Sequence, residues 1–234
     1  MQSAASALLH RTLTRLLLTI TLGIVGDALA DEVQASALRL SAWSAADASP
    51  VNVAQLFTAV AAADYLVIGE IHDNPQHHLL QAKLLAHFAD SHPGEVSVGF
   101  EQLDRDQGAS LDAFLEQNLA DVTALAEAVN WRDSGWPDFA IYEPLFSAAM
   151  QRELAIIPLM FPADTTRKVM QDGVDAVLSA TAIDRLRPDT LLGTQERRQV
   201  EIEMQDAHCG GLPESTLPAM VDVQIARDAF MAYR

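Results

Sequence analysis

The chain has 234 residues, half of them hydrophobic, and a formal net charge of -17 at neutral pH. Such an excess of carboxylates argues against binding to nucleic acid or to an anionic membrane surface, both of which require basic patches. The length suits one α/β domain with a smaller helical part, and the hydrophobic fraction is enough for a sizeable core.

The first 30 residues have the layout of a secretory signal peptide. Arg11 and Arg15 give a positive start, residues 16–25 form an apolar run, and an Ala-Leu-Ala cleavage site ends at Ala30. The apolar run is shorter than the ~20 residues that a membrane span needs. We expect cleavage after Ala30 and export to the periplasm. The rival interpretation is an uncleaved anchor at the membrane surface.

The sequence contains a single cysteine, Cys209. It excludes an intramolecular disulfide and lies far from the cleavage site, where attachment of a lipid would require a cysteine. We therefore expect a protein without a lipid anchor, and a Cys209 that is buried and inert.

Residues 31–50 are rich in Ala, Ser and Asp and are expected to wrap loosely ahead of a helix over residues 51–62. The continuous apolar run at residues 66–68 predicts a strand buried on both faces, which Gly69 brings to an end. We therefore place the start of the folded core near residue 51.

The segment after this strand predicts a loop followed by a helix. Asn74 is a good N-cap, Pro75 suits the first helical position, and apolar residues then recur with a helical period. Glu70 and His72 fall in the loop, at the carboxyl end of the strand, where open α/β sheets bind their ligands.

An acid and an imidazole two residues apart favour ligation or proton transfer over a packing role, so Glu70 and His72 are candidate site residues. His77 and His78 fall in the first turn of the helix, where solvent usually reaches the side chain. For these two histidines, each taken alone, a structural role is favoured.

Strands and helices alternate in the following part of the chain. A second strand at residues 96–100 ends in another acid, Glu101, and a third is expected at residues 155–159. The expected helices cover residues 111–118, 122–129 and 142–153. This alternation is typical of an α/β fold with a parallel sheet flanked by helices.

The sequence beyond residue 163 predicts a smaller helical subdomain. Helices are expected over residues 165–178, 194–207 and 220–233, with a Gly- and Pro-containing break at residues 209–213. The predicted organisation is therefore a signal peptide over residues 1–30, an α/β core over 31–163, and a helical subdomain over 164–234.

Five short motifs in order resemble the ChaN-like haem-binding uptake family of the Tiki, TraB and erythromycin-esterase superfamily. They read GEIHDNPQHH from Gly69, VGFEQLDRDQ from Val98, WRDSGWPDFAIYEPL from Trp131, CGGLP from Cys209, and QIARDAFMA from Gln224. The resemblance implies a parallel α/β core and a protein that holds haem for iron uptake or storage. It also implies a homodimer and an outer-membrane or transport-system partner.

The superfamily signature is a pair of G-x-x-H motifs with an acidic residue. In this sequence, the resemblance identifies Gly69 to His72 as the first motif and Glu101 as the acid. The family pattern continues past the last matched motif into a strand with a second such histidine, and the sequence ends at Arg234 without it. We expect that histidine and the closing strand to be missing from this sequence.

Tyr142 is the first candidate for an axial haem ligand, because a phenolate is a hard oxygen donor suited to ferric iron. His72 is the alternative, and His77 and Glu70 complete the predicted cofactor site. Trp131 and Trp136 are expected to pack as a structural plug. The methionines near His208 are expected to fill the core, and they are Met204, Met220 and Met231.

Three functions remain open. The first is non-covalent haem binding, because the C-x-x-C-H motif of covalent attachment is absent from the sequence. The second is a hydrolase in which Glu70, His72 and Glu101 hold a divalent metal ion that activates water. The third is an interaction domain without catalytic activity. The family resemblance favours haem.

Overall fold

The computed structural model describes residues 42–117 and 121–233. The chain divides into two compact units, one ending at Val67 and one running from Ile68 to Arg234. The predicted signal peptide lies outside the described residues. The predicted boundary between residues 163 and 164 stays a prediction, because the division at Val67 does not test it.

The first unit contains a short antiparallel strand pair and one helix. Strands β1 (Ala42–Trp43) and β2 (Pro50–Val51) pair where the sequence predicted loose wrapping, and α1 spans Val53–Ala61. Asn52 caps α1, because its side chain accepts from the Gln55 N–H at 2.9 Å while the Gln55 side chain accepts from the Asn52 N–H.

The buried strand predicted at residues 66–68 is absent. These residues have no regular secondary structure, they pair with no strand among the described residues, and Val67 is 95 % exposed. The prediction was wrong because a strand needs a neighbour for its backbone N–H and C=O groups, which apolar composition alone does not provide.

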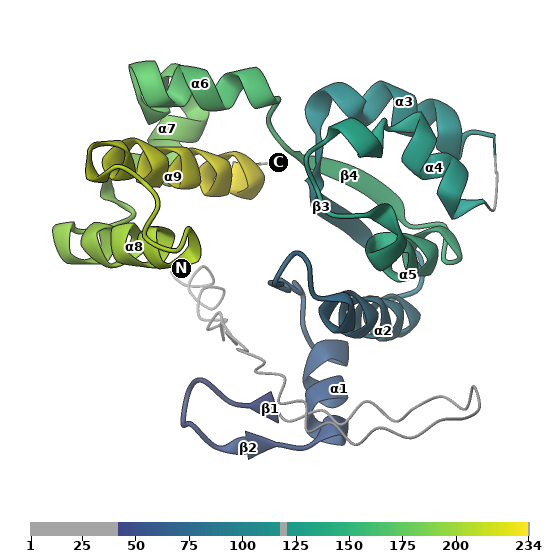
Figure 1. Ribbon diagram of the computed structural model, residues 1–234. Coiled ribbons are helices and arrows are strands. Elements are labelled where there is room, and N and C mark those ends of the chain that lie inside the picture. Colours follow the sequence, from purple (N-terminus) through teal and green to yellow (C-terminus); the bar gives the residue numbers. More distant parts are fainter. Residues whose placement is uncertain (1–41, 118–120, 234) are drawn as a thin grey trace, which may run out of the picture. The chain divides into compact units, whose positions relative to one another are not determined.

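The helix predicted after the loop is confirmed as α2 (Pro75–Ser91), with Asn74 as its N-cap and Pro75 in the first turn. It packs against α5 (Phe139–Met150), as Figure 1 shows. Helix α5 begins three residues ahead of its predicted start, because Asp138 accepts from the Ala140 N–H and caps the helix there.

Strands β3 (Ser97–Asp104) and β4 (Ala155–Met160) form a parallel pair. Between them the chain passes through α3 (Gly108–Leu115), α4 (Val122–Ala128) and α5, which confirms the α/β class with helices flanking a parallel sheet. Strand β3 runs past its predicted end, so Glu101 lies within the strand.

The main core joins β3 and β4 to the helices between them. Phe100 of β3 stacks on Phe146 of α5 with ring centroids 4.3 Å apart, and Trp131 packs edge-on against Phe146. These side chains are all nearly fully buried. The core therefore fixes α5 relative to the segment of β3 that contains Glu101.

The residues after β4 form helices, as predicted, although the boundaries differ. Helix α9 (Leu217–Tyr233) packs against α6 (Ala163–Asp172), α7 (Ala180–Leu186) and α8 (Thr194–Ala207) (Figure 1). The bounds of α8 are as predicted, whereas α6 stops early at Gly173, which adopts a positive φ of 83°. Helix α7 was not predicted.

Candidate functional site

The loop between Gly69 and Asn74 is tied to the first turn of α2 by two histidines. The Ile71 N–H donates to His77 Nδ1 at 2.9 Å, and His78 Nε2 lies 3.0 Å from the carbonyl oxygen of His72. A carbonyl oxygen only accepts, so His78 Nε2 carries a proton and donates it. The predicted pair Glu70 and His72 is thus held on a helix end.

Glu70 is the centre of a buried polar network. Its side chain is 2 % exposed, and its Oε1 accepts from His72 Nδ1 at 3.1 Å, Gln102 Nε2 at 3.0 Å and the Tyr142 hydroxyl at 3.1 Å. Its Oε2 faces the fully buried His78, with Nδ1 at 3.1 Å. Both oxygens are therefore turned toward protein groups.

Tyr142 is fully buried and its hydroxyl also lies 3.1 Å from the His72 carbonyl oxygen. Burial raises the pKa of this hydroxyl, and the charge of Glu70 together with its hydrogen bond raises it further. The group is therefore held as a neutral phenol that donates to Glu70. The structure thus places Tyr142 in contact with two other predicted site residues, Glu70 and His72.

Sequence reasoning missed three members of the network, namely His78, Gln81 and Gln102. All three are buried, and Gln81 Oε1 lies 3.0 Å from His78 Nδ1. The expectation that solvent reaches His78 was wrong, because α2 turns this side chain toward Tyr142, with ring centroids 4.0 Å apart. Gln102 follows Glu101 directly, and a polar residue inside an apolar strand was the available signal.

His72 is the open member of the site. Its side chain is 52 % exposed, and its Nδ1 faces the carboxylate of Glu70, so Nδ1 carries the proton. Its Nε2 makes no hydrogen bond to another described residue. A carboxylate that holds Nδ1–H orients the ring and leaves the Nε2 lone pair for a metal. His72 therefore has the geometry of an iron or zinc ligand.

Glu101 lies next to this pair, and one ligand atom from each of Glu70, His72 and Glu101 falls within 4.8 Å of the others. Burial raises the pKa of Glu101, and the charge of Glu70 adds to the rise, while His72 and Arg227 act in the opposite direction. The structure thus brings together the three residues predicted for a metal site.

Only one oxygen of the Glu70 carboxylate is left for a metal ion. Three partners already surround Oε1, which has two lone pairs, while Oε2 is buried 3.1 Å from His78 Nδ1 and makes no hydrogen bond to a described residue. The open side of the cluster then offers two protein donors, His72 and Glu101. Catalytic zinc sites ordinarily have three protein ligands.

A groove of about 900 Å³ lies along α4, α5 and the turn between them. Trp136 lines it and also meets the His72 ring edge-on, with centroids 4.8 Å apart. Trp131 is buried and donates from Nε1 to the Pro137 carbonyl oxygen at 2.8 Å, as the predicted plug requires. Trp136 therefore links the groove to the His72 ring.

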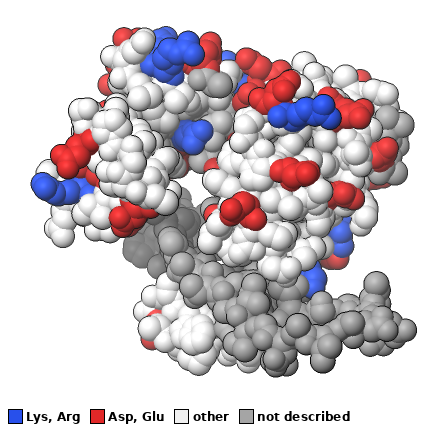
Figure 2. All heavy atoms as spheres, in the orientation of Figure 1, with Lys and Arg blue, Asp and Glu red and all other residues white. Residues whose placement is uncertain are grey.

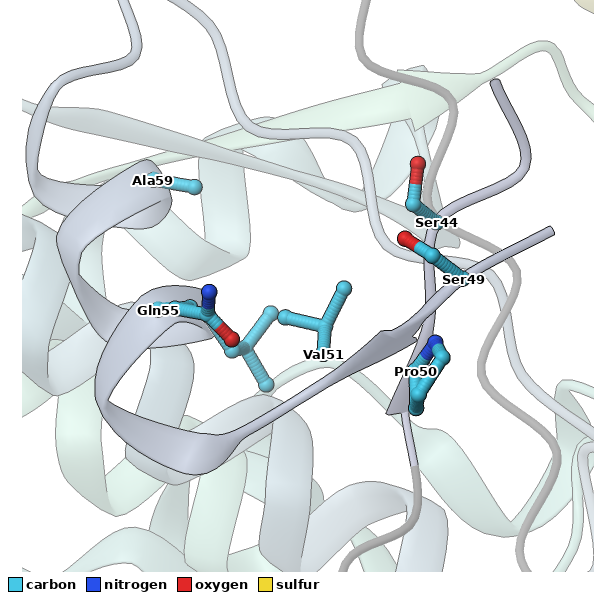
Figure 3. Close-up of a pocket in the computed structure, with 7 residues that line it drawn as sticks. Ser44, Ser49, Pro50, Val51, Gln55 and Ala59 are labelled. Carbon is cyan, nitrogen blue, oxygen red and sulfur yellow. The ribbon is translucent and has the colours of Figure 1, made fainter. Parts of the chain in front are cut away.

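A smaller hollow of about 220 Å³ lies in the first unit, between α1 and β2 (Figure 3). Its lining contains Ser44, Ser49, Val51 and Gln55. None of its lining residues is charged, and the Gln55 side chain is engaged in the cap of α1. This hollow offers no chemistry comparable to that at His72.

The structure corrects the expectation for Cys209. The residue is exposed and adopts a positive φ of 53°, in the turn that follows α8. The helix ends before it, at His208, and the tight turn keeps its side chain from reaching the core. His208 is also exposed, with Nδ1 near the Met204 carbonyl oxygen at 2.7 Å.

Residues 56–234 match the model of a protein family described as haem-binding uptake, Tiki superfamily, ChaN. The chain belongs to this family. The match covers most of the chain and confirms the family that the motifs around His72, Glu101 and Tyr142 resemble. In this ChaN-family chain, no described helix combines the length and the apolar character that a membrane span requires.

Among solved structures, the chain is similar to one titled "Cofacial heme binding to ChaN of Campylobacter jejuni". The TM-score is 0.64 at 17 % sequence identity, over 80 % of this chain and 71 % of the other. At this level of identity, the likeness shows that the two proteins share a fold. No curated protein matches the chain.

Proposed function

We propose that this protein binds haem non-covalently on the open side of the Glu70 and His72 pair, with His72 Nε2 as the axial ligand. The observation that carries the proposal is the state of His72, whose Nδ1 is fixed by a buried carboxylate while Nε2 faces outward. Membership of a haem-binding uptake family supports the same function. Imidazole is a common axial ligand of haem iron.

The other predicted ligands are less suitable than His72. Tyr142 has no exposed surface and its hydroxyl is already bound by Glu70. His77 uses Nδ1 to accept from the Ile71 N–H and is half-buried. The assignment of Tyr142 as the ligand thus stays a prediction that competes with the proposal.

The surface beside His72 suits a flat apolar ligand. Trp136 stands edge-on to the imidazole and continues into the groove, where Phe139 and the edge of Trp131 add aromatic surface. The volume of the groove is within the usual range of cofactor sites, although four carboxylates also line it, those of Glu127, Asp133, Asp138 and Glu143. Haem bound there would supply the iron, and Trp136 and Phe139 would give it apolar contact.

The biological role follows from the same proposal. We infer uptake or storage of haem in the periplasm by an exported protein that works as a homodimer with an outer-membrane or transport-system partner. The signal-like N-terminus supports export. The homodimer and the transport partner are proposed from the family resemblance, and the Campylobacter jejuni protein, described by its cofacial haem binding, supports haem as the ligand.

Titration with haem, followed by the Soret absorption band, tests the function. We expect a saturable shift with the wild type, and at least about tenfold weaker binding with His72→Ala, because the axial nitrogen is lost. His208→Ala is the matched control, since it removes another exposed histidine from this chain. The absence of a saturable shift in the wild type would contradict haem binding.

A metal-dependent hydrolase is the second candidate, because the donor atoms of Glu70, His72 and Glu101 lie within 4.8 Å of one another. Elemental analysis of the purified protein separates the two functions. One equivalent of tightly held zinc or manganese, lost in Glu101→Gln and in His72→Ala, would favour the hydrolase. We expect no stoichiometric divalent metal.

A further inference from the structure

Helix α9 brings a charged residue to the carboxyl ends of the two parallel strands. Ala226 is fully buried against Met160 and Phe161, the last residues of β4 and its continuation, and Phe230 packs edge-on to Phe161 at 5.6 Å. Arg227 follows Ala226 directly. Because Ala226 and Phe230 both pack at the end of β4, Arg227 lies near the edge of the sheet where β3 and β4 end.

The guanidinium of Arg227 lacks a partner that its burial requires. Its Nε is buried and forms no hydrogen bond with any described residue. By contrast, Arg152 binds Asp90 through two nitrogens, and Arg197 pairs with Asp222. A buried N–H without an acceptor is unfavourable, and such groups in native proteins usually have a ligand, an ion or a water as partner.

Arg227 also acts on the candidate site. Its charge is among those that lower the pKa of Glu101, while Asp228 beside it acts in the opposite direction. No ion pair joins Arg227 to Glu101 among the described residues, so its buried Nε–H is left for an acceptor on a ligand. The chain has a net charge of -17, so most of it repels an anionic group. Arg227 therefore offers such a group a defined binding position.

We propose that Arg227 binds a carboxylate of the ligand, namely a propionate of haem, and thereby fixes how the porphyrin lies over His72. This inference rests on the proposed function. A planar guanidinium recognises a carboxylate through two parallel hydrogen bonds, which lysine cannot reproduce. Arg227 is therefore a specificity residue for porphyrins with free carboxylates.

The test compares haem with haem dimethyl ester, in which both carboxylates are masked. We expect Arg227→Met to weaken haem binding about tenfold or more, the usual effect of losing a charged hydrogen bond, and to leave binding of the ester unchanged. Arg227→Lys should recover part of the affinity for haem. Arg198→Met is the control, because Arg198 is exposed on α8.

The outcomes separate this inference from the function on which it rests. If Arg227→Met weakens haem and the ester equally, or weakens neither, Arg227 does not read the carboxylate and the inference is overturned. If the wild type binds neither porphyrin, the haem function fails and the inference with it. Thermal unfolding of each variant establishes that the comparison is made between folded proteins.

Discussion

The hydroxyl of Tyr142 connects two parts of the site that are distant in sequence. It donates to Glu70 and contacts the carbonyl oxygen of His72, so a side chain of α5 holds two residues of the G-x-x-H loop. Because burial raises its pKa, this hydroxyl stays protonated and can act only as a neutral donor or acceptor. Its role is to position Glu70 and His72.

Tyr142→Phe tests this role. We expect a loss of about 1–2 kcal/mol in the free energy of unfolding, because Glu70 loses one of its donors inside the protein. The position of the Soret band of the haem complex should not change. Urea unfolding and a haem titration measure the two effects. A changed Soret band with unchanged stability would instead identify Tyr142 as the axial ligand.

Glu101 gives the protein a pH dependence of defined sign. Burial raises its pKa in the folded chain, so folding is accompanied by proton uptake at this carboxyl group. Its contribution to stability therefore falls as the pH rises from the ordinary glutamate value toward the raised, folded value. Below that window the contribution is fully present, and above the folded value it is lost.

Glu101→Gln should remove this dependence. We expect the variant to unfold at a higher temperature than the wild type at neutral pH and to approach it in acid, when melting is followed from about pH 4 to about pH 8. Glu95→Gln is a suitable control, because Glu95 is exposed. Parallel melting curves for the wild type and Glu101→Gln at every pH would contradict the assignment.

The sequence predicted that Glu70, His72 and Glu101 lie together because a strand was expected to end at each acid, yet only the strand that contains Glu101 is present. The loop with Glu70 and His72 is held by α2 instead. The sequence could not assign the burial of His78, because its place in the first turn of α2 is equally compatible with solvent. That burial depends on Tyr142, which is 64 residues further along the chain. Contacts between such distant segments leave no local pattern.

At the scale of elements, β3 and β4 approach each other closely at Gly99. A Cβ atom added to Gly99 would clash with the side chain of Leu159 on the neighbouring strand. The glycine therefore allows the two strands to approach while Leu159 covers them. This approach fixes the segment of β3 that leads to Glu101.

Gly99→Ala should destabilise the protein by about 1 kcal/mol, the lower end for overpacking, because Gly99 is exposed and the half-buried Leu159 side chain can move aside in part. Leu159→Ala in the same chain should relieve part of this loss, because it removes the atoms that clash. Gly108→Ala is a matched control, since an added Cβ would meet Pro158 at 3.8 Å, an ordinary contact. Urea unfolding of the three variants and the double mutant measures the coupling. Additive losses would contradict the contact.

Helices with clear end signals were predictable from the sequence, and the unpaired strand was not. Asn74 and Pro75 define the start of α2, while Gly193 precedes α8 and the break that starts at Cys209 follows it. The run at residues 66–68 was assigned to a strand on composition, although no described strand pairs with it. Pairing is a property of two segments, so one segment cannot predict it.

At the scale of the whole molecule, acidic side chains outnumber basic ones by 32 to 15. Figure 2 shows Asp and Glu scattered among few Lys and Arg on the visible face. The net charge of -17 repels polyanions and favours a neutral or cationic partner. The proposed carboxylate site at Arg227 is a local exception. An anionic ligand must therefore be recognised through specific contacts, since long-range attraction does not assist its approach.

The N-terminal segment predicts where the mature chain begins. We expect export and cleavage after Ala30, because a positive start, an apolar run and a small-residue site follow one another in order. Mass spectrometry of the periplasmic fraction should find Asp31 as the first residue. Replacing Ala30 by a bulky residue should retain the precursor. A mature chain that starts elsewhere, or stays in the cytoplasm, would contradict this prediction.

The hydrogen bond from the Ile71 N–H to His77 Nδ1 makes one amide proton a reporter of the loop. Ile71 is 60 % exposed, yet its amide is protected from exchange as long as His77 Nδ1 keeps its lone pair. His77→Phe keeps a ring at this position and removes the acceptor. Amide exchange at Ile71 should then be faster than in the wild type, so an isotope label at one backbone nitrogen would record when the loop leaves the helix.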